Sequence, residues 1–383
     1  MSEEKIVFSR PFRAEREGEN LEAVLASGHA HGDGRFTASA TAKLERITQS
    51  KNVLLTTSCT HALEMTSVLL DLKPGDEVIL PSYTFPSAAT AVSAYGATSV
   101  FVDVQKDTGV IDPELIEDAI TPRTKAISVM HYGGVAPDMR RVLDIAHTHG
   151  IPVIEDNAHG LGGAWNGQQL GTFGAFATQS FHSTKNVHSG EGGALLINDE
   201  RFVERAEIIR EKGTNRSRFL RGQVDKYSWV DKGSSYLPSE LNAAVLDAQL
   251  EQFDQIQGLR VEIWERYASE LAQWAELNGV APMTLPPASA QVAHLFYLLM
   301  PSFDAQQGLL QHLRDHDIIG TFHYIPLDSS VAGRKFGRTP RECPNSLDFS
   351  QRIVRLPLWA GMSEAQVARV IAAVRSFGVT RAA

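Results

Sequence analysis

Short β-rich runs alternate with helical patterns between about residues 50 and 215, and no other feature limits the possible folds of this chain so strongly. The expected strands are residues 53–55, 77–80, 99–102, 126–130 and 153–154. The expected helices are residues 60–72, 86–95 and 140–148. Parallel strands need long crossovers, which are usually helical. The alternation therefore predicts an α/β fold in which helices cover both faces of a mainly parallel sheet.

Two more β-rich runs, residues 175–180 and 193–198, have no helical pattern between them, so we expect a mixed sheet of seven strands. A long helical stretch over residues 239–271 then precedes a segment with both strand and helix patterns. A chain of 383 residues also exceeds the size at which one core keeps growing. We predict a large domain over residues 1–250, including the N-terminal segment, and a smaller C-terminal α+β domain over residues 251–383.

The net charge of −9 argues against nucleic acid as a partner, because a nucleic-acid-binding protein is expected to present a basic face. No run approaches the ~18 apolar residues of a membrane span, and the first residues lack the pattern of a signal peptide. Cys59 and Cys343 lie far apart in the sequence, which fits a reducing compartment and provides no metal framework. We expect a cytoplasmic protein with no metal site and no membrane contact.

Lys185 lies in a context that favours a covalent cofactor site. It follows Ser180-Phe181-His182-Ser183-Thr184 and precedes the glycine-rich Gly190-Glu191-Gly192-Gly193. Upstream, Glu155-Asp156 ends a predicted strand. A lysine that forms an imine and an acid that pairs with the ring nitrogen are the two protein groups that pyridoxal phosphate chemistry requires. A lone lysine after a strand is usually on the surface, but the acid, the hydroxyls and the glycines favour pyridoxal 5'-phosphate.

Together, Glu155-Asp156-Asn157-Ala158-His159, the segment that ends in Lys185 and the glycines after it resemble the nucleotide-sugar aminotransferases of the DegT/DnrJ/StrS family. The resemblance runs from about residue 32 to residue 358. It implies the aspartate aminotransferase-like fold, also called fold type I, and a transferase activity that depends on pyridoxal 5'-phosphate. The runs at residues 211–217 and 221–227 are similar to the subgroup that makes TDP-4-amino-4,6-dideoxygalactose.

The resemblance places the cofactor phosphate on Cys59 and Thr60, at the start of the helix expected after the first strand. Free backbone N–H groups and the positive end of the helix dipole make such a start a natural phosphate site. A hydroxyl there would serve equally well as a simple N-cap. Ser180 is implied as a second hydroxyl on the same phosphate. Cys59 would act through its backbone, without thiol chemistry.

Three side chains are implied around the cofactor ring: Phe85 would stack on it, Asp156 would hold its protonated nitrogen, and His159 would bond its phenolic oxygen. Adjacent strand residues face opposite sides, so only one of Glu155 and Asp156 can serve, and the resemblance assigns the role to the second acid. We expect the ring cation to lower the Asp156 pKa against the effect of burial. Lys185 would be the catalytic residue, which holds the cofactor and then moves a proton as general base and acid.

A cationic cluster follows at residues 212–226. We name Arg216, Arg218, Arg221 and Lys226 as candidate contacts for a nucleotide diphosphate, because guanidinium forks suit phosphate. A solvated loop would carry the same residues. His323 and Tyr324 fall in a segment that is similar to one near the family's sugar pocket.

The resemblance also implies a homodimer with a shared active site. Relatives commonly carry Gly-x-Asn-x-Arg, in which the asparagine reaches the neighbouring subunit's cofactor phosphate. This chain has Gly233-Ser234-Ser235-Tyr236-Leu237 instead, so Ser235 or its backbone replaces that ligand, or the contact is absent.

The expected reaction moves the amino group of L-glutamate to the 4-keto group of dTDP-4-dehydro-6-deoxy-D-glucose and gives dTDP-4-amino-4,6-dideoxy-D-galactose. Amination at carbon 3 and a gluco product are alternatives within the family. A catalytically silent, pyridoxal phosphate-binding regulatory protein is an alternative of another class. A family branch that dehydrates sugars carries histidine in place of the lysine, so Lys185 favours transamination. An NAD-dependent enzyme is disfavoured because no Gly-x-Gly-x-x-Gly motif opens the first helix.

Overall fold

The computed structural model describes residues 4–379, and its central element is an eight-stranded sheet. In sheet order the strands are β1 (Val53–Thr56), β9 (Gly193–Ile197), β8 (Phe176–Ser180), β5 (Val153–Asp156), β4 (Thr124–Met130), β2 (Glu77–Pro81), β3 (Thr98–Val102) and β12 (Gly337–Arg338). From β8 to β12 all neighbours are parallel, whereas β9 is antiparallel to both β1 and β8. The prediction of a mixed, mainly parallel sheet is confirmed. The expected seven strands are joined by an eighth, β12, which pairs with β3 from the C-terminal part of the chain.

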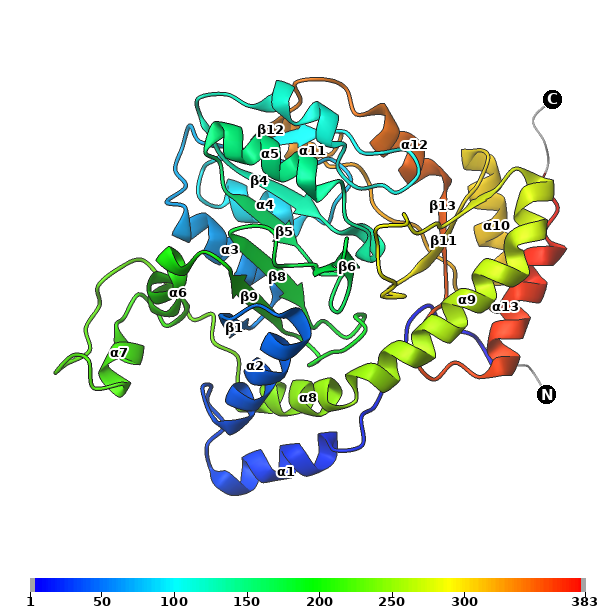
Figure 1. Cartoon of the computed structure of the whole chain (residues 1–383). Helices are drawn as coiled ribbons and strands as arrows, with labels where there is room; N and C mark the ends of the chain where they lie inside the picture. Colours follow the sequence, from blue (N-terminus) through cyan, green and yellow to red (C-terminus); the bar gives the residue numbers. More distant parts are fainter. Residues whose placement is uncertain (1–3, 380–383) are drawn as a thin grey trace.

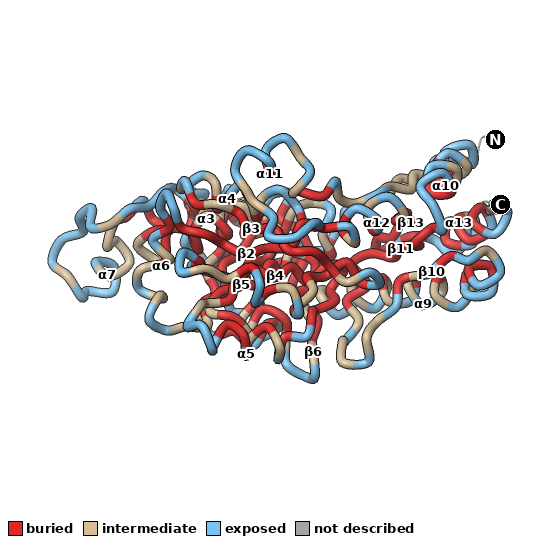
Figure 2. Tube along the Cα trace, turned by 90° about the horizontal axis from the view of Figure 1, so that it is seen from above, coloured by how far each residue is buried: buried red, intermediate tan, exposed pale blue. Residues whose placement is uncertain are grey.

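Helices cover both faces of this sheet, as the alternation predicts (Figure 1). On one face Val78 and Ile154 pack with α3 (Cys59–Leu69), α4 (Ser87–Ser93) and α6 (Val203–Arg210). On the other face Ile79 packs with α5 (Met139–His149). Neighbouring residues of one strand, such as Val78 and Ile79, pack against helices on opposite faces of the sheet because strand side chains alternate. Figure 2 shows the buried strands between more exposed outer surfaces.

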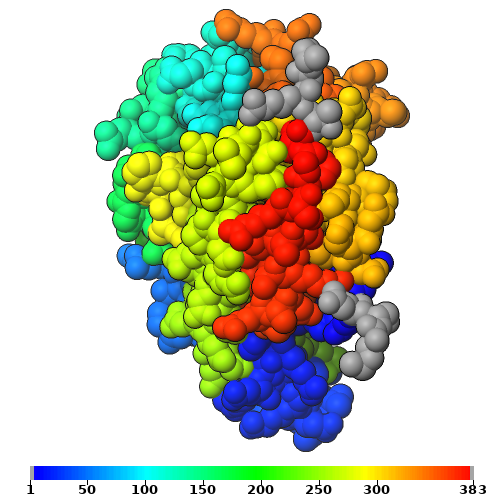
Figure 3. Space-filling model, turned by 90° about the vertical axis from the view of Figure 1, so that its right-hand side faces the viewer, coloured from blue at the N-terminus to red at the C-terminus, as the bar shows by residue number. Residues whose placement is uncertain are grey.

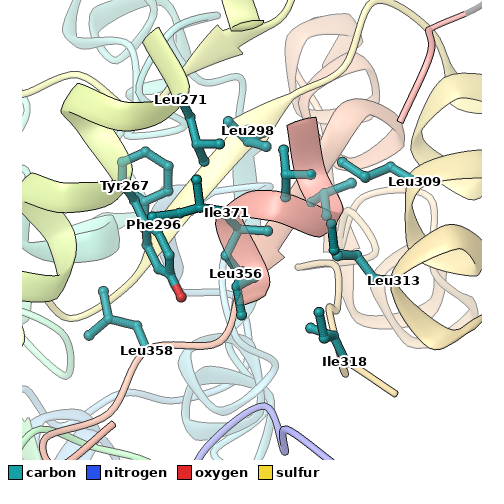
Figure 4. Packing of buried hydrophobic residues seen from close by; sticks show 14 of the residues in the cluster. Tyr267, Leu271, Phe296, Leu298, Leu309, Leu313, Ile318, Leu356, Leu358 and Ile371 are labelled. Carbon is teal, nitrogen blue, oxygen red and sulfur yellow. The ribbon is translucent and has the colours of Figure 1, made fainter. Parts of the chain in front are cut away.

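A second, smaller sheet is antiparallel throughout, in the order β10 (Ala281–Pro282), β11 (Phe296–Leu299) and β13 (Ile353–Leu356). Its core is completed by α9 (Phe253–Asn278), α10 (Phe303–Asp315) and α13 (Glu364–Ser376). Figure 4 shows Tyr267, Leu309 and Ile371 packed together there. On the outer surface, α13 lies along α9 (Figure 3).

The N-terminal segment contacts this second core. Ile6 is fully buried in it and pairs with Ile318. The sequence-based division assigns the segment to the large domain, and the apolar contacts of Ile6 put its first described residues beside the small sheet instead. The boundary near residue 250 stays a proposal. Within residues 4–379, no helix is long and apolar enough to cross a membrane.

The long helical stretch expected at residues 239–271 is two helices, α8 (Glu240–Glu251) and α9, which meet at Gln252. Helix α8 packs against α1 (Glu17–Ser27) and α2 (Arg35–Thr48). The Glu240 carboxylate accepts hydrogen bonds from the N–H groups of Gly34, Phe36 and Thr37, so it satisfies the start of α2. The α8–α9 pair thus leads the chain from the large sheet to the small one (Figure 1).

Residues 211–235 form an arm that projects beyond α6, with α7 (Arg216–Leu220) near its far end (Figures 1 and 2). The large apolar side chains that the arm exposes are Phe219, Leu220, Tyr227, Trp229 and Val230. The rings of Phe219 and Tyr227 lie 6.0 Å apart, and exposed apolar groups that gather in this way often mark an interaction site.

Candidate active site

A cavity of about 490 Å³ lies at the carboxyl ends of the strands, between the large sheet and the small one. Ligands of open α/β sheets gather at that edge. The predicted residues that line it are Cys59, Thr60, Phe85, Asp156, His159, Ser180, Lys185, His323 and Tyr324. These residues come from distant parts of the sequence, and the fold brings all nine to one cavity.

One end of the cavity is the start of α3. The Ser58 hydroxyl caps this helix by accepting from the His61 N–H at 3.1 Å. Gly193 packs against the same turn so closely that an added Cβ would lie 2.4 Å from the Cys59 nitrogen. The Thr60 and Ser87 hydroxyls are 2.7 Å apart. Backbone N–H groups, hydroxyls and the helix dipole therefore suit a phosphate at this end of the cavity.

The two adjacent acids of β5 have separate environments. Glu155 is fully buried and faces away from the cavity. Its carboxylate accepts from His131 Nε2 at 2.8 Å and from the N–H groups of Gly171, Phe173 and Gly174. Asp156 lines the cavity, and within residues 4–379 the only hydrogen bond to its carboxylate is one at 3.2 Å from the Ala158 N–H.

Burial raises the Asp156 pKa above its usual value, and the Ala158 N–H and the Lys185 ammonium oppose that rise. The expected lowering therefore depends on the cation that a protonated cofactor ring would add. Burial also raises the pKa of the Cys59 thiol to about 12, helped by the charge of Asp156. The thiol stays protonated at neutral pH, in line with a backbone role for Cys59.

Phe85 is 53% exposed, although it stands directly after the Tyr83 and Thr84 that are buried in the core. Its ring meets Tyr324 edge-on at 6.0 Å. Core packing, the ordinary explanation for an aromatic at a strand end, does not apply to it. A half-exposed ring on the wall of a cavity is instead available for stacking on a planar ligand.

His159 is held as a neutral imidazole, because burial and the charge of Lys185 lower its pKa well below the usual value. The Gly133 N–H donates to its Nδ1 at 3.3 Å, which leaves the proton on Nε2. The ring stacks on His294 at 4.1 Å. A donor Nε2–H in this cavity suits an oxyanion such as a phenolate.

Burial lowers the pKa of Lys185 to about 8, while Cys59 and Asp156 raise it and Arg355 lowers it further. A lysine with this pKa carries a substantial neutral fraction near neutral pH, so its amine is a usable nucleophile. The groups present thus fit pyridoxal phosphate at each position tested: an anion site, a carboxylate for the ring nitrogen, a donor for the phenolic oxygen and a reactive lysine. Among residues 4–379, no group of three or more His, Cys, Asp or Glu side chains is placed to hold a metal ion.

The candidate contacts for the nucleotide diphosphate lie outside this cavity. Arg216, Arg218, Arg221 and Lys226 are on the arm and do not line the cavity. Arg218 pairs with Glu204 at 2.8 Å and Arg221 with Glu207 at 2.7 Å. Arg216 and Lys226 have no ion pair within the described residues. Sequence reasoning grouped these cations correctly with one another, but a single chain does not bring them to Lys185.

Several cavity residues were missed by the sequence reasoning. They are Phe8, Ser87, His294 and Arg355. Arg355 begins Arg355-Leu356-Pro357-Leu358, the segment where the family resemblance ends, and that position was the available signal. Phe8 and His294 stand in stretches with no motif, so only the fold reveals their place.

Comparison with known proteins gives a consistent result. The profile of the DegT/DnrJ/EryC1/StrS aminotransferase family matches residues 11–375. The spore coat polysaccharide biosynthesis protein SpsC of Bacillus subtilis (strain 168) is 33% identical over 334 residues, which cover 85% of each chain.

Two solved structures are similar in fold. The aminotransferase TlmJ from Streptoalloteichus hindustanus has a TM-score of 0.89 and 27% identity, over 97% of this chain and 98% of that one. The Spr1654 protein of Streptococcus pneumoniae in its PLP form has a TM-score of 0.89 and 26% identity, over 97% and 98% of the two chains.

Proposed function

Because the chain belongs to the DegT/DnrJ/EryC1/StrS aminotransferase family, we propose that it transfers the amino group of L-glutamate to the 4-keto group of dTDP-4-dehydro-6-deoxy-D-glucose. The proposed product is dTDP-4-amino-4,6-dideoxy-D-galactose. The cofactor is pyridoxal 5'-phosphate. The observation that carries the proposal is that Lys185 and Asp156 face one cavity together with the start of α3.

The bound cofactor supplies an electron sink for reactions at the carbon that carries the amino group. Asp156 would hold the ring nitrogen in its protonated form, and the start of α3 with Thr60 and Ser180 would hold the phosphate. Phe85 would cover one face of the ring and exclude water from it. His159, whose Nδ1 accepts from the Gly133 N–H, would donate from Nε2 to the phenolic oxygen.

Lys185 performs the proton movement. Its Nζ would hold the cofactor, and when free its amine would take a proton from the substrate carbon as general base and give it back as general acid. In the protein without cofactor the pKa of this amine is about 8. Positioned proton transfer of this kind contributes roughly 10²–10⁴-fold in rate.

The sugar assignment is supported by the runs at residues 211–217 and 221–227, which resemble the 4-aminating subgroup. The relatedness to a polysaccharide biosynthesis protein also favours a sugar substrate. Amination at carbon 3, a gluco product and a silent regulatory protein are the competing readings. The presence of both Lys185 and Asp156 disfavours the silent protein. A cytoplasmic location stays part of the proposal.

We propose in addition that the active unit is a homodimer. The arm exposes apolar side chains and carries Arg216 and Lys226, which have no acidic partner within the described residues. A second copy that receives the arm would bring these cations to its own cavity. At a sugar concentration well below the wild-type KM, where both parent variants should be weakly active, a mixed dimer of Lys185→Ala and an Arg216→Ala/Lys226→Ala chain contains one intact site and gains activity over either parent. No recovery in the mixed dimer would contradict a shared site.

The reaction is tested with purified holoenzyme, L-glutamate and dTDP-4-dehydro-6-deoxy-D-glucose. NMR of the product should show nitrogen at carbon 4 and a galacto configuration. Nitrogen at carbon 3 would refute the subgroup assignment. A gluco product would leave the enzyme class in place and overturn only the stereochemistry. Absence of turnover with every nucleotide-linked ketosugar would favour the silent protein.

A further inference from the structure

Arg355 is a buried cation of the cavity that has no part in the reaction described above. It stands in β13, is 7% exposed and lines the same cavity as Lys185. Its Nη1 donates to His323 Nε2, and its guanidinium lies over the Phe8 ring at 4.6 Å. Its Nε is buried and has no hydrogen-bond partner. Within residues 4–379 no Asp or Glu forms an ion pair with it.

The charges around the cavity do not balance Arg355. Asp156 is the buried carboxylate of the lining, and the ring nitrogen of the cofactor is its proposed partner. Glu191 is exposed and lies 3.6 Å from His182. Burial lowers the pKa values of His159 and His294 far enough to keep both neutral. A buried guanidinium with no anion carries a large desolvation cost.

Another buried arginine near the cavity shows what a purely structural role looks like. Arg260 is 4% exposed and donates from Nε to the Ala293 carbonyl at 3.0 Å. Its Nη2 donates to the His294 carbonyl at 2.7 Å. Carbonyl acceptors therefore satisfy Arg260 inside the protein. Arg355 has donors of the same kind, and its Nε meets no acceptor.

We propose that Arg355 binds the α-carboxylate of the amino donor. A guanidinium offers two parallel N–H donors in the geometry of a carboxylate, and that pairing would supply the anion that Arg355 lacks within the described residues. Arg355 and Lys185 line the same cavity, so a carboxylate held by Arg355 shares that cavity with the reacting nitrogen. Phe8 and His323 fix the guanidinium in place. The inference rests on the proposed aminotransferase function and assigns its amino-acid subsite.

The two half-reactions of the holoenzyme separate this role from the sugar chemistry. L-Glutamate alone converts the bound cofactor to its amino form, which changes its absorbance, and the dTDP-amino-sugar product does the same in the reverse direction. Each is titrated with wild type, Arg355→Met and Arg355→Lys. Arg352→Met is the matched control, because Arg352 lies three residues earlier, pairs with Asp348 and does not line the cavity.

We expect Arg355→Met to raise the half-saturating glutamate concentration roughly 30-fold or more. The value for the amino sugar should change less than about threefold, because that substrate has no carboxylate. Arg355→Lys should recover part of the loss, since an ammonium keeps the charge and loses the fork. Arg352→Met should match wild type in both titrations.

Equal losses for glutamate and amino sugar, or a loss for the amino sugar alone, would overturn the proposal. L-Glutamine keeps the α-carboxylate and lacks the side-chain carboxylate, so it tests which of the two Arg355 binds. If Arg355→Met does not change the half-saturating glutamine concentration, Arg355 contacts the side-chain carboxylate of glutamate instead. The cofactor absorbance and thermal midpoint of each variant report whether its site is intact, and Arg355→Lys carries the test if Arg355→Met does not fold. A wild type that reacts with glutamate but not with the sugar contradicts the proposed sugar reaction and leaves the Arg355 test standing.

Discussion

The cavity and the arm both contain arginines, but they use them in opposite ways. In the cavity Arg355 is buried, has no acidic partner and faces a reactive lysine. On the arm Arg218 and Arg221 are partly exposed and already paired with Glu204 and Glu207 of α6. A buried unpaired cation marks a place for an anion. An exposed cation that already has an acidic partner adds little to the binding free energy of an anionic ligand. Pairing and burial, and not the number of cations, therefore indicate a ligand site.

Lys185→Ala should have the largest effect in the molecule. Loss of the amine removes both the covalent link and the proton carrier, so turnover should fall by at least roughly 10²–10⁴-fold. Steady-state assay with glutamate and the ketosugar measures this. Borohydride reduction and peptide mapping should find the cofactor on Lys185 in wild type. A labelled peptide centred on another lysine would sink the assignment and, with it, the central role of the cavity.

Substitutions of the neighbours Glu155 and Asp156 should affect different quantities, the unfolding free energy for Glu155 and the turnover for Asp156. Asp156→Asn should lower turnover roughly 10–100-fold, because it removes a charged hydrogen bond to the ring nitrogen, and leave the thermal midpoint nearly unchanged. Glu155→Gln should cost about 1–3 kcal/mol of unfolding free energy, because one buried amide oxygen cannot accept what His131 and three N–H groups donate. Activity assays and thermal unfolding of both variants test the contrast, which fails if the two effects are exchanged.

The arm should show a smaller graded effect on sugar binding. Arg216→Ala and Lys226→Ala should raise the KM for the nucleotide sugar by up to about tenfold, since these cations are unpaired within the described chain. Arg218→Ala and Arg221→Ala should change it less than about threefold, because their charges already meet Glu204 and Glu207. The four KM values test this, with the KM for glutamate as the control. Equal changes of the sugar KM in all four variants would contradict the idea that the unpaired cations bind the sugar nucleotide and the paired ones do not.

The smallest effect is a shift along the pH axis. Binding of the cofactor to the cofactor-free protein needs the neutral Lys185 amine, so its rate should rise with pH, be half-maximal near pH 8 and level off roughly one pH unit higher. Arg355 lowers the Lys185 pKa, so Arg355→Met should move the midpoint to higher pH. Stopped-flow absorbance over pH 6–10 measures both, within roughly one pH unit. An unchanged midpoint would mean that the Arg355 charge does not reach the amine.

Much of the cofactor end was predictable because its residues stand in local motifs. Asp156 ends a strand, Lys185 follows one, and Cys59 starts a helix, so the order of elements along the chain suffices to bring them to one edge of the sheet. The alternation of strand side chains predicted that Asp156 and Glu155 face opposite sides, which they do, and the family resemblance chose Asp156 as the acid of the cavity.

The substrate end was harder because its residues come from segments without a shared pattern. Arg355 and His294 reach the cavity only through the small sheet, whose strands are antiparallel partners far apart in sequence. The break of the long helix at Gln252 was also missed, since the helical pattern continues through that residue. The arm cations do not line the cavity of their own chain, and their place beside the cavity of a second copy stays a prediction, because local charge density carries no information about tertiary position.

The short strand β12 has a mechanical consequence. It belongs to the C-terminal part of the chain but hydrogen-bonds to β3, and Asp103 at the end of β3 accepts from the N–H groups of Asn345 and Ser346 at the start of α12 (Pro344–Arg352). The small sheet is thus fastened to the large one near β12 as well as through the junction at Gln252. Besides these two attachments, Tyr132 of the large sheet's side packs in one buried cluster with Tyr297 and Phe349 of the C-terminal part. The two sheets are therefore expected to behave as one rigid body, which keeps Arg355 and Lys185 at a fixed relative position.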